Sequence, residues 1–265
     1  MIKQVFFKVV TCLASSDPSG YTLEICCYSE NDIISAIKGG ATRIELCAGQ
    51  RDGGTTPSYG ALLQARQYLP KIDIVVMIRP RGGDFCYSHS ELQQMVEDIK
   101  LVKQLGFNGV VFGALTHQAT VDLDACKRLI AASTNLASTF HRAFDCTANP
   151  TVAATQLSEL GINRVLSSGQ QNYIEQGLPL LIALQQQHQD IEWIVAGGVR
   201  AHNLAMLKKQ GIKHFHSASS EPLLSQFDTR YALAMAADKD PQLELQRAQV
   251  SQREVSSMAL ALERN

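Results

Sequence analysis

The chain has 265 residues, of which 45% are hydrophobic and 18% are charged, and its formal net charge is -1. A chain of this length can bury a full core, and its near-neutral charge gives no support for nucleic acid or an anionic membrane surface as a partner. No apolar run approaches the roughly 18 residues that cross a bilayer, and seven cysteines without framework spacing favour free thiols in a reducing cytoplasm.

Residues 1–20 are predicted to form an N-terminal extension, and residues 21–265 are predicted to form one domain. The extension contains a short apolar run that Lys8 interrupts. The run is therefore shorter than the roughly 7–15 apolar residues of a secretion signal. The last residues of the extension, from Ser15 to Gly20, have the composition of a loop.

From Tyr21 onward, strand and helix patterns alternate along the chain. Strands are predicted at residues 22–26, 43–47, 74–79, 109–112, 137–141, 164–167, 192–196 and 213–217. Helices are predicted at residues 29–38, 59–69, 90–105, 122–132, 150–160, 174–187 and 201–210, with a closing helix at 242–262. Several of these helices end at a glycine, such as Gly106 and Gly211, as is common at helix C-termini. Eight strands in strict alternation with helices predict an α/β fold, a (β/α)8 TIM-type barrel; a doubly wound open sheet is the alternative.

The third predicted strand ends in a polar cluster. Arg79 is its last residue, and Pro80 follows, which cannot continue a strand ladder. The next loop contains Arg81, two glycines and Asp84. Taken alone, this loop could be a surface turn with a solvated ion pair.

Other predicted strands also end in chemically reactive residues. The carboxyl ends of the strands meet at one mouth of a barrel, so we expect these side chains to converge there and to be solvated. These side chains are unlikely to serve only as core residues, because buried charges are costly unless they are paired. The residues at or just after these strand ends are Glu24, Cys26, Glu45, Cys47, His141, Arg142, Asp145, Ser168, Gly197, Gly198, His216 and Ser217.

Nine short motifs, spread from residue 23 to residue 219, give the chain a resemblance to the CutC family, which is named for copper homeostasis. IRPRGGDF and TFHRAFD are the most specific of them. The motifs are LEICCYS (23–29), GGATRIELC (39–47), GGTTPSYG (53–60), VMIRPRGGDFCYS (76–88), GVVFGAL (109–115), TFHRAFD (139–145), RVLSSG (164–169), AGGV (196–199) and HFHSAS (214–219). The resemblance implies a (β/α)8 barrel, in agreement with the pattern of elements.

The resemblance also implies a copper site with Cys26 and Cys47 as Cu(I) ligands. Cu(I) is a soft ion that prefers thiolates. The two cysteines would end adjacent strands, about 4.8 Å apart, on the same inward side. The alternative is that each cysteine is a small buried hydrophobic residue, which is the commonest state of a free cysteine.

An enzyme is the rival interpretation, with a small phosphorylated or carboxylated metabolite as substrate and a lyase, isomerase or hydrolase type of reaction. Arg79 and Arg142 would clamp the anion, and His141 would act as general acid or base. The candidate catalytic residues are Glu45, Arg79, Asp84, His141, Arg142 and Asp145, and the candidate ligand-binding residues are Glu24, Arg81, Ser168, Gly197, Gly198, His216 and Ser217. A weaker alternative is Zn²⁺ bound by His141, His216 and Glu45. The expected partner is thus a copper ion or a small anionic metabolite, and we expect a homo-oligomer, a dimer.

Overall fold

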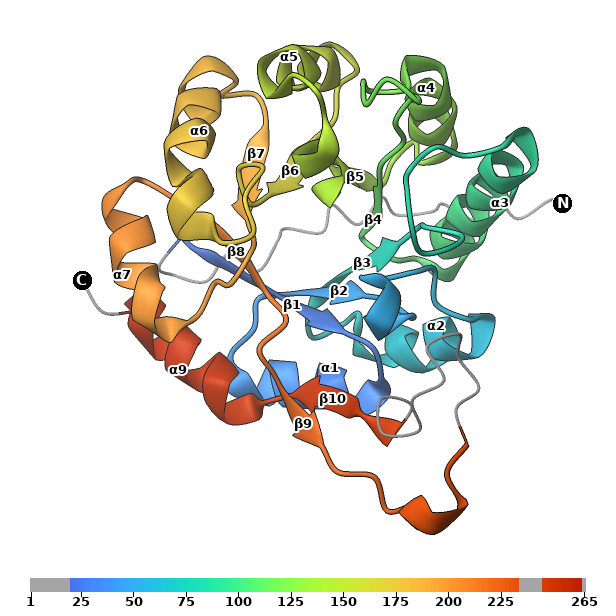
Figure 1. The fold of residues 1–265 in the computed structure, drawn as a ribbon, viewed down its shortest axis with the longest axis vertical. Helices are drawn as coiled ribbons and strands as arrows, with labels where there is room; N and C mark the ends of the chain where they lie inside the picture. Colours follow the sequence, from blue (N-terminus) through green and yellow to red (C-terminus); the bar gives the residue numbers. More distant parts are fainter. Residues whose placement is uncertain (1–19, 234–244, 264–265) are drawn as a thin grey trace, which may run out of the picture.

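The computed structural model describes residues 20–233 and 245–263 and contains a closed barrel of eight parallel strands, seen nearly end-on in Figure 1. Neighbours in the chain pair throughout, and β1 closes the barrel by pairing with β8. The predicted barrel is confirmed, and the open-sheet alternative is wrong. Apart from Gly20, the predicted N-terminal extension lies outside the described residues. The strands are β1 (Thr22–Cys27), β2 (Arg43–Leu46), β3 (Asp73–Met77), β4 (Gly109–Phe112), β5 (Ala137–Phe140), β6 (Arg164–Ser167), β7 (Glu192–Val195) and β8 (His214–Ser217).

Helices follow the strands and surround the barrel (Figure 1). Their ends show the expected local chemistry. Ser88 and Glu91 form a capping box at the start of α3, and Gly40 and Gly106 adopt the left-handed conformation at the ends of α1 and α3. The helices are α1 (Glu30–Gly39), α2 (Tyr59–Ala65), α3 (His89–Leu105), α4 (Leu123–Ala132), α5 (Pro150–Glu159), α6 (Ile174–Gln187), α7 (Ala201–Lys209) and α9 (Gln252–Glu263).

The segment after β8 differs from the prediction of a single closing helix at 242–262. Residues Arg247–Val250 form strand β10, which pairs antiparallel with β9 (Ser220–Leu223), and α9 begins only at Gln252. Residues 242–244 lie outside the described part of the chain. The helical pattern is overridden because β9 takes up the backbone hydrogen bonds of β10, and Asp32 Oδ1 accepts a further bond of 2.7 Å from Val250 N. Helix α9 then packs against α1 and α7.

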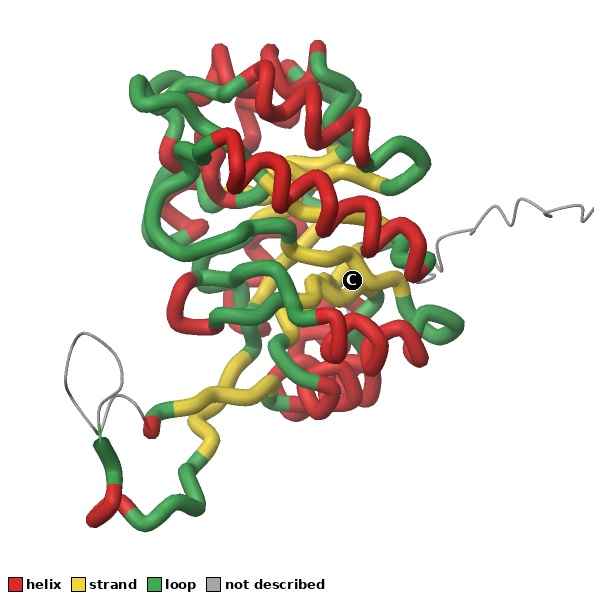
Figure 2. The backbone as a smooth tube through the Cα atoms, turned by 90° about the vertical axis from the view of Figure 1, so that its right-hand side faces the viewer, coloured by secondary structure: helices red, strands yellow, loops and turns green. Residues whose placement is uncertain are grey.

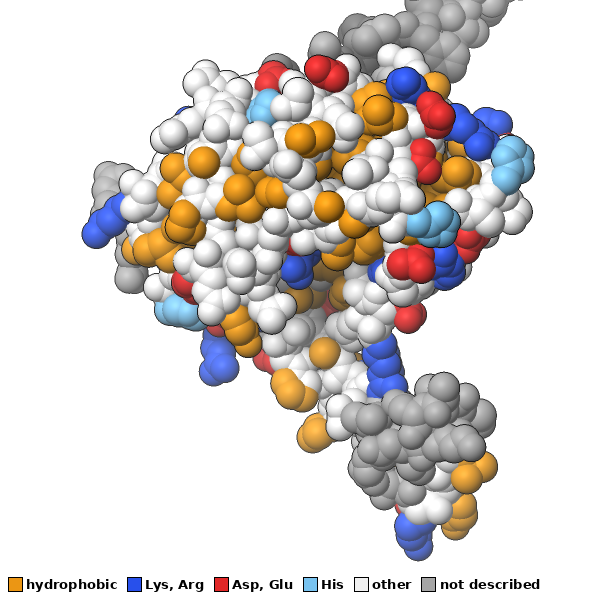
Figure 3. Space-filling view, turned by 45° about the horizontal axis from the view of Figure 1, so that its top comes forward, with side chains coloured by type: hydrophobic (Ala, Val, Ile, Leu, Met, Phe, Trp, Pro, Cys, Tyr) orange, Lys and Arg blue, Asp and Glu red, His pale blue; other side chains and the backbone are white. Residues whose placement is uncertain are grey.

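The β9–β10 hairpin projects from the body of the molecule (Figure 2). The segment that follows β9 exposes several large apolar side chains, and the same projection is visible in Figure 3. These side chains are Leu224, Phe227, Tyr231 and Leu233. No helix among residues 20–233 and 245–263 is long and apolar enough to cross a membrane.

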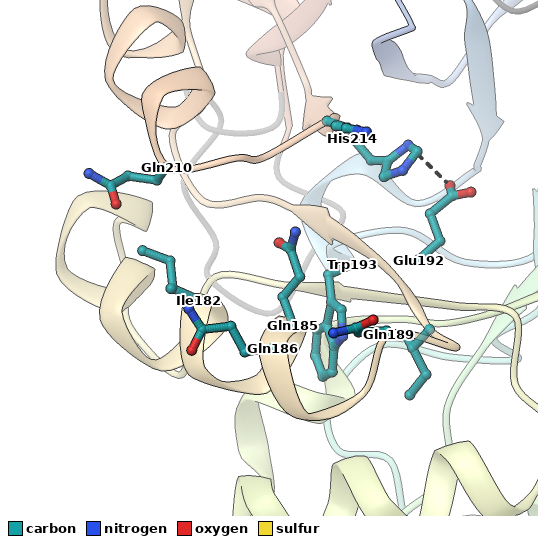
Figure 4. Close-up of a pocket in the computed structure, with 10 residues that line it drawn as sticks. Ile182, Gln185, Gln186, Gln189, Glu192, Trp193, Gln210 and His214 are labelled. Carbon is teal, nitrogen blue, oxygen red and sulfur yellow. Dashed lines mark ion pairs between the residues drawn. The ribbon is translucent and has the colours of Figure 1, made fainter.

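The amino-terminal half of the barrel interior is filled by an ion-pair network. Arg43 Nε lies 2.5 Å from Glu24 Oε2, and Arg43 Nη1 lies 3.1 Å from Glu192 Oε1. Arg164 and His214 also contact Glu192, at 3.3 and 3.5 Å. Figure 4 shows the Glu192–His214 pair at the edge of a cavity of about 360 Å³ whose lining includes four glutamines. This end of the barrel is closed by a structural plug, and the reactive strand ends lie at the opposite end.

Candidate functional site

A cavity of about 290 Å³ lies at the carboxyl ends of the strands. The molecular face in Figure 3 is hollowed near its centre, and basic side chains lie inside the hollow. Nine of the residues predicted for the site line the cavity, from strands or loops on most sides of the barrel. They are Cys26, Glu45, Arg79, His141, Arg142, Gly197, Gly198, His216 and Ser217.

The guanidinium of Arg79, at the end of β3, donates to three main-chain oxygens and lies over the ring of Phe85. Its Nη1 donates to the carbonyls of Asp52 (2.5 Å) and Gly54 (3.0 Å), and its Nη2 donates to the carbonyl of Gly83 (2.8 Å). Its Nε is buried and has no hydrogen-bond partner among the described residues. No ion pair within residues 20–233 and 245–263 includes Arg79, so its charge has no carboxylate to balance it.

His141, from the end of β5, lies beside Arg79. The rings of His141 and Phe85 have centroids 5.0 Å apart, and Arg79 Cζ lies 5.0 Å from the centroid of the same phenyl ring. His141 Nδ1 accepts a hydrogen bond from Ala143 N (3.1 Å). Nε2 therefore carries the proton of the neutral ring, and this atom is buried without a partner.

Both side chains are more deeply buried than the prediction of a solvated mouth allows. Arg79 is 5% exposed and His141 is 3% exposed. That prediction is wrong for these two residues because the loops after β2 and β3 fold over them. Burial, together with the nearby charge of Arg79, lowers the pKa of His141 to about 3, so the ring is neutral at physiological pH.

Three further polar residues form a chain across β1, β2 and β8. His216 Nδ1 lies 2.7 Å from Glu24 Oε1, and His216 Nε2 lies 3.8 Å from Glu45 Oε2. Burial alone would lower the pKa of His216, but the carboxylates of Glu45 and Glu24 outweigh it and raise the pKa. Burial raises the pKa of Glu45, whereas the charges of Arg43 and His216 overcome burial and hold the pKa of Glu24 far below its usual range. Glu24 is therefore a fixed negative charge below the cavity, and Glu45 faces the cavity.

Two thiols meet above Glu45. Cys26 Sγ and Cys47 Sγ are 3.7 Å apart, and Cys47 Sγ lies 3.5 Å from Glu45 Oε2. Burial raises the pKa of Cys47 well above its usual value. The contact with Cys47 lowers the pKa of Cys26, but burial and the charge of Glu45 outweigh it, so this pKa is raised as well. Cys27 points the other way, toward the carbonyl of Ile25, as the strand alternation predicts.

The donor atoms within reach of one another form two sets that could hold a metal ion. One set is Cys26, Glu45 and Cys47, and the other is Glu24, Glu45 and His216. His141 belongs to neither set, so the Zn²⁺ set predicted with Glu45 and His216 is not assembled. The first set offers the soft sulfur ligands that Cu(I) prefers, while the second is harder.

Several predicted site residues serve the loops instead of facing the cavity. Asp145 accepts hydrogen bonds from Arg142 Nε, Ser167 Oγ, Ser168 N and Gln170 N, among others, so its oxygens are fully used in holding the β6–α6 loop. Ser168 Oγ donates to Gln171 O within the same loop.

Charged residues of the loop after β3 form ion pairs with nearby residues and do not face the cavity. Arg81 pairs with Glu91 at 2.6 Å and with Asp84 at 3.1 Å. Neither Arg81 nor Asp84 lines the cavity. They fix the loop that places Phe85 beside Arg79 and His141.

The remaining lining residues were missed by sequence reasoning. Arg200 is the most informative of them: its Nη1 donates to Ser217 Oγ and to the carbonyl of Val199, both at 2.8 Å. Its place directly after the AGGV motif was a signal for it. The others are Tyr28, Gly53, Met77, Phe85, Leu166, Ala196 and Ala218.

A family model described as the CutC family matches residues 21–221. The chain belongs to the CutC family. A CutC family protein from Photorhabdus laumondii subsp. laumondii is 45% identical over 219 residues, which cover 82% of this chain and 88% of that relative. A CutC family protein from Pectobacterium atrosepticum is 46% identical over 199 residues, covering 75% of this chain and 79% of that relative.

Solved structures agree with this CutC assignment. One crystal structure is that of a copper homeostasis protein CutC from Streptococcus agalactiae, which is 36% identical to this chain. The two superpose with a TM-score of 0.71, and the match covers 75% of this chain and 98% of that one. A phosphoribosyl anthranilate isomerase from Thermus thermophilus superposes with a TM-score of 0.51 at 12% identity, covering 91% of this chain and 98% of that one. At that identity the likeness shows the barrel fold alone.

Proposed function

We propose that this CutC-family protein binds Cu(I) through Cys26 and Cys47 and serves copper homeostasis in the cytoplasm. The observation that carries the proposal is the 3.7 Å separation of the two sulfur atoms at the ends of adjacent strands. A small side-chain rotation would let both sulfurs contact one soft ion. Both thiols are protonated in the metal-free protein, so binding of Cu(I) would release protons. The affinity for Cu(I) would therefore rise with pH. The name of the Streptococcus agalactiae relative supports the same role.

The test is a competition titration of Cu(I) against a chelator. The double variant Cys26→Ser, Cys47→Ser is expected to lose tight binding, because hydroxyls are poor ligands for a soft ion. The matched control is Cys86→Ser, Cys126→Ser, which removes two thiols that lie outside the site and is expected to keep wild-type affinity. Equal losses in the two double variants would mean that the thiols bind copper without specificity and would refute the proposal.

A second candidate function is supported by a different observation. Glu45 Oε1 is buried at the cavity without a hydrogen-bond partner, and His216 lies 3.8 Å from the other oxygen of this carboxylate. An unpartnered carboxylate oxygen that faces a cavity can give or take a proton from a bound molecule. We therefore also propose an enzyme of the lyase or isomerase type, in which Glu45 moves a proton on a small anionic metabolite and His216 positions Glu45.

This second function can be tested without copper. A panel of small phosphorylated and carboxylated acids is incubated with the protein in D₂O, and incorporation of deuterium at carbon is followed by NMR. Wild type is expected to catalyse exchange in at least one acid, and Glu45→Gln should slow it by about 10²–10⁴-fold, the usual contribution of a general base. The same exchange rate in both proteins would exclude Glu45 as the proton carrier.

A further inference from the structure

The cavity at the mouth carries an excess of positive charge on one side. On the β1, β2 and β8 side, Glu24 and Glu45 face Arg43 and His216, so acids and bases balance there. On the β3 and β5 side, Arg79 is 5% exposed and has no carboxylate partner among the described residues. A buried cation without an anion is costly for a fold to keep. The imbalance therefore points to a negatively charged ligand.

Arg79 and His141 keep a small number of hydrogen-bond donors without partners on this side. Carbonyl oxygens take both N–H groups of Arg79 Nη1 and one N–H group of Nη2, which leaves Nε and the second N–H group of Nη2. His141 offers one further donor, its Nε2. Both groups flank the ring of Phe85, each at 5.0 Å. A few donors beside one positive charge suit two oxygens that share one negative charge.

We propose that the mouth cavity binds a small organic acid, with the carboxylate on the Arg79 and His141 side and the apolar part over Met77, Leu166 and Ala196. These three side chains line the same cavity, and its volume of about 290 Å³ suits only a small molecule. Glu45 lines the same cavity, so a ligand bound in this way would share the cavity with that carboxylate. The inference names the ligand class of the second proposed function and is independent of copper.

The fold also argues for a carboxylate over a phosphate. Barrels that bind phosphate commonly use the loops after strands 7 and 8, with the N-terminus of a short extra helix as part of the site. In this chain the segment after β8 enters strand β9 instead of a helix. The β7 side is further restricted because Ser217 Oγ is bonded to Arg200 and to the carbonyl of Val199. Among the described residues that line the cavity, the buried donors without partners are Arg79 Nε and His141 Nε2, on the β3 and β5 side.

The test uses copper-free protein and three probes: propionate, its neutral isostere propionamide, and inorganic phosphate. Titration by calorimetry, supported by ligand-stabilised melting, is expected to show millimolar binding of propionate. Binding of propionamide and of phosphate should be at least about 10-fold weaker, because a bond to a charged partner contributes about 10- to 100-fold in affinity. Equal binding of propionamide and propionate, or tighter binding of phosphate, would overturn the inference.

Two variants locate the site. His141→Asn keeps an oxygen that can accept from Ala143 N but lacks the distal donor, and Arg79→Lys keeps the charge but not the guanidinium. Each variant is expected to lower the affinity for propionate by about 10-fold or more. Arg164→Met is the matched control: it removes a partly buried arginine at the plugged end, and it should leave propionate affinity unchanged even if stability falls. A loss of propionate affinity in all three variants, or in none of them, would overturn the proposed location of the site.

The outcomes separate this inference from the enzyme proposal. Binding of propionate that depends on Arg79 and His141, with no deuterium exchange in any acid, supports the carboxylate site and refutes catalysis. Exchange on a phosphorylated substrate in a protein that does not bind propionate supports catalysis and refutes the carboxylate site.

Discussion

Replacing Glu24 with Ala is expected to lower the free energy of unfolding by about 3–5 kcal/mol, the usual effect of removing one partner from a buried ion pair. Glu24 is 1% exposed and contacts both Arg43 and His216. Without Glu24, the buried side chains of Arg43 and His216 lose the carboxylate that neutralises them. Urea denaturation at neutral pH measures the change.

A surface pair provides the control for this prediction. Glu97 contacts Lys100 at 2.8 Å, and both side chains are more than half exposed, so Glu97→Ala should cost only about 0–1 kcal/mol. A second comparison is the double variant Glu24→Leu, Arg43→Met, which replaces the pair by apolar groups and should cost less than the sum of the two single changes. A loss below about 1 kcal/mol in Glu24→Ala would show that water reaches this network.

The second large effect is a loss of stability in acid that depends on His141. Its pKa is lowered from 6.5 to about 3 in the folded protein. Because the folded-state pKa is below the unfolded value, the stability it confers is complete above pH 6.5 and is lost as the pH falls toward 3. Each pH unit in this window costs about 1.4 kcal/mol. When the pH is lowered from about 7.5 to about 4.5, protonation of His141 should reduce the free energy of unfolding by on the order of 3 kcal/mol.

The comparison of wild type with His141→Asn isolates this group. Asparagine is a good residue at a helix N-terminus, where His141 accepts from Ala143 N, and it does not titrate. The variant should therefore show a smaller fall in urea-derived stability over the same pH range. His117→Asn, at an exposed position, should behave as wild type. Parallel pH profiles for all three proteins would mean that His141 protonates in the folded state without cost.

The sequence predicted the barrel well because its physical signals are local and repeated. Most strands contain apolar residues between turn or helix signals, and glycines such as Gly106 end helices in the left-handed conformation. The proximity of Cys26 and Cys47 followed from the same pattern, because residues at the ends of adjacent parallel strands must be neighbours. The CutC resemblance singled out these two cysteines, and the strand pattern explained their proximity, although the residue directly opposite Cys26 is Glu45.

The parts that were not predicted depend on contacts that the local pattern does not encode. The helical periodicity of residues 242–262 gave no sign that β9 would pair with Arg247–Val250. The burial of Arg79 depends on carbonyls of the loop after β2, whose path a local pattern does not specify. Asp145 looked catalytic as a residue type, but its oxygens accept hydrogen bonds from the neighbouring Arg142 and from three residues of the β6–α6 loop that only the fold brings near it.

Closure of the barrel has a consequence for the order of events during synthesis. Glu24 and His216, which contact each other across the β1–β8 seam, are 192 residues apart in the chain. At roughly 5–20 residues per second, a ribosome needs roughly 10–40 s to make the stretch between them. During that interval the first two strands carry Glu24, Glu45 and both thiols without the strand that covers their open edge. The nascent chain thus exposes the two thiols for which we propose Cu(I) binding well before the cavity exists.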